Sequence, residues 1–245
     1  MNLKKEFMII AVPSKSRAGS TTTDKLISKS TFFVPESEVH QYQNYVENIV
    51  GIPKKIQGIT KTRNWILKNC KDEKVVMLDD DVIKAGWIDV KKNNVEHNRI
   101  NDENFWIDEF EKNFDLCNQL GYKIWGLKTE SSTKSYYCYK PIVFKTYALG
   151  SCMGIINDGE YLFDESFPVK EDYELCLRHI KEKGGLLGIR YLYWENNHWK
   201  KDGGCKDYRT VAIEKKAIKD LIKLYPSMIS QVKKRKNEFT IKLNF

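Results

Sequence analysis

The stretch KVVMLDDDV, residues 74–82, leads four apolar residues directly into three consecutive aspartates. Its short length and its β-branched start predict a buried strand rather than a helix. Asp79, Asp80 and Asp81 then lie at the carboxyl end of that strand. Carboxylates this close repel one another unless a cation neutralises them, and their hard oxygen atoms suit Mg²⁺ or Mn²⁺. The triplet therefore predicts a divalent metal site, with a solvated acidic turn as the alternative.

Strands and helices alternate on both sides of this stretch. Apolar periodicity predicts strands at 6–12, 30–37, 74–82, 122–129 and 188–199, a pair of strands within 136–158, and helices at 38–51, 58–74, 105–121, 171–185 and 214–239. Such alternation indicates an α/β fold with a Rossmann-type, mostly parallel sheet and helices on both faces. Ligands of such sheets bind at the carboxyl ends of strands, where the aspartates lie.

Composition limits the class of protein. The chain has 245 residues, 41% of them hydrophobic, and no apolar run approaches the roughly 20 residues that span a bilayer. Six scattered cysteines without CxxC spacing are typical of reduced thiols in a cytoplasmic protein. We expect a monomer with one domain over 1–200 and a basic C-terminal extension, 201–245, packed on it. No membrane association is predicted.

Positive charge gathers toward the C-terminus. The formal net charge is +8, and residues 181–245 hold sixteen Lys and Arg against seven Asp and Glu. A basic segment of this kind favours a polyanionic partner such as a nucleic acid.

Two further segments are suited to phosphate. The loop that follows the first strand contains Pro13, Ser14, Lys15 and Arg17, whose side chains could contact a nucleotide base and its phosphates. Arg63 falls in the first turn of a predicted helix, where free N–H groups and the helix dipole favour anions. An ordinary surface arginine is the alternative. Neither GxGxxG nor GxxxxGK[ST] occurs, so the sequence indicates neither a dinucleotide-binding fold nor a P-loop.

An acidic pair opens the later helix. Glu171 and Asp172 can be favourable partners of the helix dipole, or, beside a metal-diphosphate site, one of them can be a general base. His198 lies at the end of the last predicted strand and is a candidate metal ligand, although a lone histidine is more often structural.

The motifs VPSKSRAG, TRNWIL, LDDD and ED occur in an order that resembles the GT-A glycosyltransferases. The triple aspartate is similar to their DxD motif and the Glu-Asp pair to their xED motif. More narrowly, the motifs resemble the TET/JBP-associated glycosyltransferases of phages and kinetoplastids, which put sugars on hydroxymethylated DNA bases. Together with the loop chemistry, the resemblance implies metal ligands Asp81, Asp79 and His198, donor-binding residues Pro13, Ser14, Lys15, Arg17, Arg63, Asp79 and Asp80, and catalytic residues Asp172 and Glu171.

The resemblance implies a metal-dependent, inverting transferase, with Mn²⁺ or Mg²⁺ as cofactor and a UDP-sugar as donor. The acceptor that it implies is 5-hydroxymethylcytosine, or a related base, in DNA, within a phage-infected bacterial cytoplasm. A glycan, a lipid-linked sugar or a protein as acceptor is the alternative within the same fold. A nucleotidyltransferase would need a Gly-rich phosphate loop that is not evident. A DNA-binding protein without enzymatic activity would not explain the three aspartates.

Overall fold

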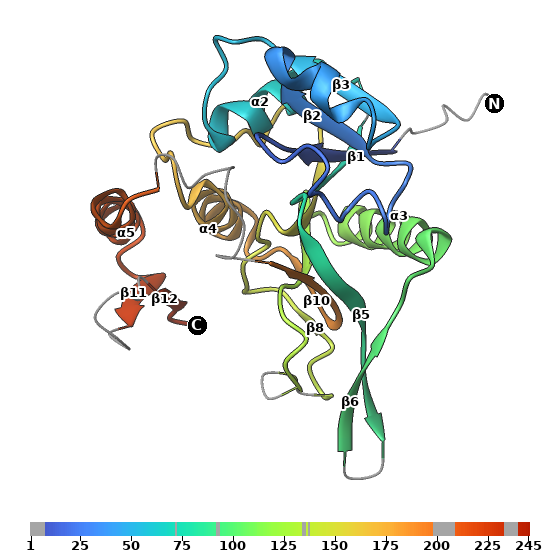
Figure 1. The fold of residues 1–245 in the computed structure, drawn as a ribbon. Coiled ribbons are helices and arrows are strands. Elements are labelled where there is room, and N and C mark those ends of the chain that lie inside the picture. The colour runs from blue at the N-terminus through green and yellow to red at the C-terminus, as the bar shows by residue number, and fades with distance from the viewer. Residues whose placement is uncertain are drawn as a thin grey trace, which may run out of the picture.

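The computed structural model describes residues 8–71, 73–91, 94–133, 136, 138–197, 209–232 and 240–245 (Figure 1). The strands are β1 (Met8–Pro13), β2 (Thr31–Pro35), β3 (Asn48–Ile52), β4 (Lys74–Leu78), β5 (Val82–Lys91), β6 (Asn94–Arg99), β7 (Ile124–Lys128), β8 (Ile142–Val143), β9 (Cys152–Ile156), β10 (Leu187–Asn196), β11 (Ile229–Val232) and β12 (Thr240–Leu243). The helices are the short 3₁₀ helix η1 (Glu36–Glu38), α1 (Val39–Tyr42), α2 (Ile59–Asn69), α3 (Glu103–Gln119), α4 (Glu171–Lys183) and α5 (Val211–Leu224). The α/β class that the alternation predicts is confirmed.

One large sheet runs through the molecule in the order β3-β2-β1-β4-β9-β7-β10-β5-β6, with β8 also paired to β10. The pairs β2–β3, β1–β2, β1–β4 and β7–β10 are parallel, whereas β4–β9, β7–β9, β5–β10, β8–β10 and β5–β6 are antiparallel. The expectation of a mostly parallel sheet is therefore wrong, and the sheet is mixed. The cause is the insertion of β9 between β4 and β7, together with a long hairpin, β5–β6, at the edge.

The aspartate triplet connects two distant strands. The chain leaves β4 at Leu78, passes through the three aspartates and enters β5 at Val82, which pairs with the end of β10. β4, β7 and β10 all run in one direction, because β4 and β7 are each antiparallel to β9 and β7 is parallel to β10. Their carboxyl ends therefore meet at the edge where the aspartates lie.

Two apolar layers hold the sheet. One cluster joins the sheet to α2, α4 and α5, and the other joins it to α3 and to the loop and helix around α1. Aromatic rings fill the second layer: Trp106 of α3 packs edge-on against Trp194 at 5.3 Å between centroids, and Phe110 stacks on Trp125 at 5.6 Å. Figure 1 shows α3 on the side of the sheet opposite α4.

Two predicted helices are shorter than expected. The helix predicted at 38–51 ends at Tyr42, and its β-branched Ile49 and Val50 instead pair with β2 as strand β3. The helix predicted at 214–239 ends at Leu224, because Pro226 cannot continue the hydrogen-bond ladder, and β11 follows.

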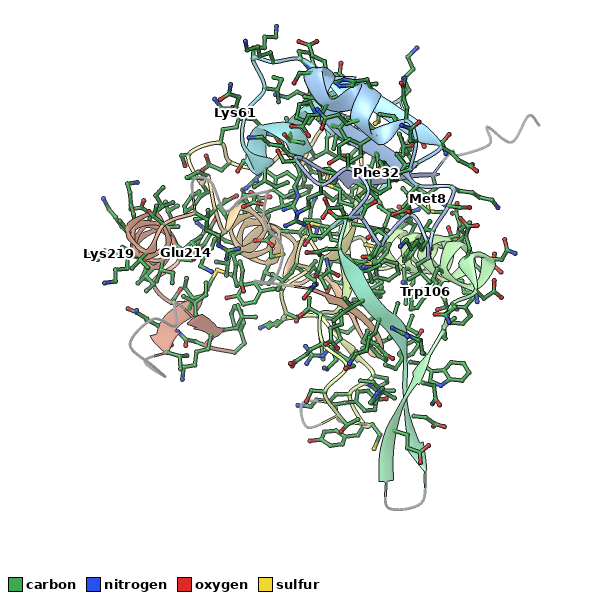
Figure 2. All side chains as sticks on the ribbon, viewed as in Figure 1. Met8, Phe32, Lys61, Trp106, Glu214 and Lys219 are labelled. Carbon is green, nitrogen blue, oxygen red and sulfur yellow. The ribbon has the colours of Figure 1, made fainter. Side chains whose placement is uncertain are left out.

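The C-terminal elements pack on the sheet domain. Ala217, Ile218 and Leu221 of α5 lie in the same apolar cluster as α4. The inward-facing Glu214 forms an ion pair with Lys170, at 3.2 Å, just before α4, whereas Lys219 points outward (Figure 2). Residues 201–208 and 233–239 of the predicted extension lie outside the described residues, and the domain boundary stays a prediction. Within the described ranges, no helix has the length and apolarity needed to cross a bilayer.

Replacing Leu221 with Ala should lower the free energy of unfolding by about 2–5 kcal/mol, because the side chain is fully buried and its removal leaves a cavity. Urea denaturation followed by circular dichroism measures this loss. Leu224→Ala is the matched control, since Leu224 is 52% exposed on the same helix. Equal small losses for both variants would show that α5 is not part of the cooperative core.

Candidate active site

Asp80 is the most tightly bound member of the aspartate triplet. Its side chain is buried, and it accepts hydrogen bonds from the Ser14 hydroxyl and from Nη1 of Arg17. The same Arg17 nitrogen lies 3.3 Å from Oδ2 of Asp81. Burial raises the pKa of Asp80 above its ordinary value, and Arg17 opposes that rise. Arg17 therefore neutralises part of the charge that the triplet concentrates.

The backbone of the triplet is held by the loop between β1 and β2. The amide of Thr22 donates to the carbonyl of Asp80 at 3.0 Å, and the Thr23 hydroxyl donates to the carbonyl of Asp79 at 2.7 Å. The amide of Asn197, at the end of β10, donates to the carbonyl of Asp81 at 3.0 Å. The three aspartates are thus fixed from both sides of the sheet edge.

The predicted donor loop contacts this edge through Ser14 and Arg17. Tyr42 of α1 holds both: its hydroxyl shares a hydrogen bond of 2.8 Å with the Ser14 hydroxyl and accepts one of 3.0 Å from the amide of Arg17. Pro13 ends β1, and Lys15 is exposed. Sequence reasoning missed Tyr42, whose only local signal is an apolar helical spacing that equally suits packing.

Arg63 connects the triplet to the acidic pair. Its guanidinium is buried, with Nη2 3.4 Å from Oδ1 of Asp79 and Nη1 2.5 Å from Oε1 of Glu171. The surface arginine alternative is therefore wrong. A Cβ atom on Gly150 would lie 1.9 Å from Nη2 of Arg63, so only glycine leaves room for the guanidinium there. Gly150 was not predicted from the sequence.

Two polar side chains of α2 bind the chain segment that leads to α4. The Thr60 hydroxyl donates to the carbonyl of Phe167 at 2.6 Å, and Nδ2 of Asn64 donates to the carbonyl of Phe163 at 2.9 Å. Both contacts join α2 to the chain just before Glu171. One face of α2 therefore positions the acidic pair as well as Arg63.

The two acids of the pair lie in different environments. Glu171 is 4% exposed and ion-paired, and burial raises its pKa to about 7, while Arg63 acts against that rise. Asp172 is partly exposed and accepts hydrogen bonds from the amides of Gly150, at 3.1 Å, and Tyr173, at 2.9 Å. Since a carboxylate has about four acceptor positions, these bonds orient Asp172 and leave room for a further partner.

The predicted metal ligands are only partly brought together. In the described part of the chain no group of three His, Cys, Asp or Glu side chains is arranged to hold a metal ion, and His198 lies outside the described residues. In an extended strand the side chains of Asp79 and Asp81 would point to the same face, but the chain bends at Asp80. As a result, Arg17 contacts Asp80 and Asp81, whereas Arg63 contacts Asp79. Two carboxylates with substrate phosphates are nevertheless a usual Mg²⁺ ligand set, so Asp79 and Asp81 fit such an ion in their chemistry.

Comparison with known proteins gives one family and a common fold. The family profile described as TET-Associated Glycosyltransferase matches residues 8–204. A search of the curated proteins found no match.

Among solved structures, glucosyl-3-phosphoglycerate synthase from Mycobacterium tuberculosis with Mg²⁺ and UDP is similar with a TM-score of 0.55 and 10% identity, covering 98% of this chain and 87% of that one. S. aureus TarS with UDP-GlcNAc is similar with a TM-score of 0.51 and 13% identity, covering 88% of this chain. The match spans 66% of that TarS chain, slightly less than two thirds of its length. At these identities the likeness shows the fold, which is GT-A-like.

Proposed function

Because the chain belongs to the TET-associated glycosyltransferase family, we propose that it moves a sugar from a UDP-sugar to 5-hydroxymethylcytosine, or a related hydroxylated base, in DNA. The observation that carries the proposal is the chain of contacts from Asp79 through Arg63 to Glu171, which puts Asp172 beside the aspartate edge. A net charge of +8 supports a polyanionic acceptor.

The donor binds at the aspartate edge. Asp79 and Asp81 would hold Mn²⁺ or Mg²⁺, and the bound ion would supply positive charge to stabilise the departing diphosphate. Ser14 and Arg17 line the part of this site that binds the nucleotide. When the donor binds, Arg17 gives up its contact with one aspartate of the triplet and contacts the donor instead. Arg63 keeps the carboxylate of Asp79 oriented through their ion pair.

Asp172 acts as the general base. Its carboxylate takes the proton of the acceptor hydroxyl while that oxygen forms a bond to the anomeric carbon of the sugar. The bond between this carbon and the diphosphate oxygen breaks, and UDP leaves with the electron pair. A base on the side opposite the leaving group gives inversion of the anomeric centre. The backbone amides of Gly150 and Tyr173 hold the carboxylate in one orientation throughout.

The direct test incubates the purified protein and Mn²⁺ with single UDP-sugars and an oligonucleotide that contains 5-hydroxymethylcytosine. Digestion to nucleosides and mass spectrometry should reveal one nucleoside heavier by one sugar residue with the correct donor. The same oligonucleotide with unmodified cytosine is the control and should give no product. Transfer to a glycan or protein acceptor, with none to DNA from any donor, would contradict the proposed acceptor.

Replacing Asp81 with Asn should weaken Mn²⁺-dependent UDP binding by about 10–100-fold or more, a range typical even of the residues that support metal ligands. Isothermal titration with UDP, with and without Mn²⁺, measures the effect. Asp108→Asn is the matched control, because it removes the same charge from an exposed position on α3. Equal Mn²⁺-dependent binding by Asp81→Asn and the native protein would rule out Asp81 as a ligand.

A further inference from the structure

A pocket of about 150 Å³ lies where β7 and β10 separate. The two strands pair as far as Leu127 and Ile189, and the next pair, Lys128 with Tyr193, follows only after a register shift. Six of the lining residues have side chains that can carry charge or form hydrogen bonds, namely Lys128, Thr129, Glu130, Thr146, Tyr147 and Arg190; the others are two glycines and the apolar Leu127, Leu149 and Ile189. The proposed donor site uses none of them.

A pair of glycines shapes the pocket. Gly126 of β7 and Gly188 of β10 are directly paired. A Cβ atom on Gly126 would lie 2.6 Å from Ala148, and one on Gly188 would lie 2.3 Å from Cγ2 of Thr146, so the segment 146–149 rests directly on the sheet. Since side chains alternate along a strand, the residues two positions further on point to the same face. Those residues are Lys128 and Arg190, the two cations of the pocket.

Positive charge exceeds negative charge in this pocket. The Lys128 side chain is 2% exposed; its Nζ donates to the carbonyl of Glu130 at 2.5 Å and lies 3.7 Å from the Glu130 carboxylate. Arg190 is half-buried. Burial lowers the pKa of both cations, and the repulsion from Arg190 lowers that of Lys128 further. Glu130 partly balances them, but its side chain is 59% exposed and can turn toward solvent.

Hydroxyl groups complete the set of donors. The hydroxyl oxygen of Tyr147 is buried and makes no hydrogen bond to any residue that the structure describes. Its ring packs on Tyr173, with centroids 4.5 Å apart, and so is fixed in place. Two cations around one opening, with a tyrosine among the lining residues, are suited to an anion with several oxygen atoms, such as a phosphate group.

The pocket adjoins the proposed catalytic acid. Tyr147 and Leu149 line the pocket, and the next residue, Gly150, donates its amide to Asp172 at 3.1 Å. The carboxyl ends of β4 and β7 lie two strands apart on the same sheet edge, which corresponds to roughly 10 Å. A phosphate held in this pocket would therefore lie near Asp172 and at the same sheet edge as the aspartate triplet.

We propose that this pocket binds one backbone phosphate of the acceptor DNA, through Lys128, Arg190 and the Tyr147 hydroxyl, and so sets which hydroxyl reaches Asp172. The inference deepens the proposed function and rests on it for the identity of the acceptor, which is DNA. The phosphate contact itself can be tested by binding alone, without any sugar transfer.

The test measures the affinity of the native protein and of Arg190→Gln for a fluorescent 5-hydroxymethylcytosine oligonucleotide by anisotropy. A series of oligonucleotides replaces each phosphate near the target base, one at a time, by an uncharged methylphosphonate. For the native protein one replacement should weaken binding about tenfold, which is typical of a lost charge-assisted hydrogen bond. Arg190→Gln should bind the all-phosphate DNA about tenfold more weakly and should be insensitive to that same replacement.

Three controls make the result specific. Arg190→Lys keeps the charge and should recover part of the affinity and of the sensitivity. Lys112→Gln removes a positive charge from a 67% exposed side chain on α3 and should behave like the native protein. Lys128→Met is a second variant of the pocket, expected to act as Arg190→Gln does.

Two results would overturn the inference. One is an Arg190→Gln variant that folds, binds DNA as the native protein does and keeps the same methylphosphonate sensitivity. The other is an equal loss of UDP affinity in the pocket variants, which would assign the pocket to the donor phosphates. If the native protein transfers no sugar to DNA but Arg190 still governs one phosphate contact, the proposed function fails and the phosphate pocket stands.

Discussion

Replacing Asp172 with Asn should lower the turnover of sugar transfer by about 10²–10⁴-fold, the usual contribution of a general base. Gly150 donates to Oδ2 and Tyr173 to Oδ1, so the single amide oxygen of Asn keeps one of these two hydrogen bonds, and circular dichroism checks that the variant folds. UDP affinity should be unchanged, because the role proposed for Asp172 is toward the acceptor and not toward the donor. Steady-state kinetics with saturating donor and acceptor, together with titration of UDP, measures the two quantities separately.

Glu171→Gln is the matched control for this prediction. The Glu171 carboxylate is buried against Arg63 and is not available to an acceptor, so its loss should reduce stability more than chemistry. After correction for the folded fraction, this variant should keep more than about a tenth of the native turnover. The opposite pattern, a silent Asp172→Asn and an inactive Glu171→Gln, would assign the base to Glu171.

Local pattern predicted the elements that carry the site, and failed where pairing between distant segments decides the structure. The strand before the aspartates was predicted from its short, β-branched apolar run, α2 from a threonine near its N-cap, and α3 and α4 from apolar residues at helical spacing. β5 and β6 were not predicted, since their pairing depends on close approach: a Cβ atom on Gly86 would lie 1.8 Å from the carbonyl oxygen of Asn98. The mixed sheet was missed for the same reason, because the residues of β9 do not show whether its neighbouring strands run parallel or antiparallel to it.

Residue chemistry likewise predicted which side chains matter better than how they pair. The three aspartates, Arg63 and the acidic pair were chosen from the sequence, and the structure brings them together. Within the acidic pair, Glu171 is buried and Asp172 is accessible. This difference depends on tertiary packing, which the sequence of two adjacent acids does not show. The ion pairs that Arg17 and Arg63 form with the triplet were not predicted from the sequence. The catalytic and binding roles stay predictions.

Replacing Arg63 with Met should lower the free energy of unfolding by about 3–5 kcal/mol, because removing one partner of a buried ion pair leaves the other uncompensated. Two carboxylates lose their cation, that of Glu171 in the interior and that of Asp79 at the sheet edge. Urea denaturation measures the loss. Lys61→Met is the matched control, since Lys61 lies exposed on the outer side of α2 (Figure 2) and its replacement should change stability by at most about 0.5 kcal/mol.

The effect of Arg63→Met should also depend on pH in a direction that follows from Glu171. Burial raises the pKa of Glu171 from an ordinary 4.5 to about 7 although Arg63 lowers it, so without Arg63 the pKa rises further. A carboxyl group whose pKa is raised by folding contributes stability at low pH and loses it as the pH rises through the folded value. The destabilisation by Arg63→Met should therefore be larger at pH 8 than at pH 5.5, where the orphaned carboxyl is protonated.

The double variant Arg63→Met, Glu171→Gln separates charge from packing. Because Gln carries no charge to bury, this variant should recover part of the lost stability at pH 8 and should lose most of the pH dependence. If the two substitutions instead add without any recovery, the cost of Arg63→Met comes from lost contacts with Phe163 and Gly150 rather than from an uncompensated carboxylate. The link from the aspartate triplet to the acidic pair would then be steric, and the ion pairs of Arg63 would have no part in positioning Asp172.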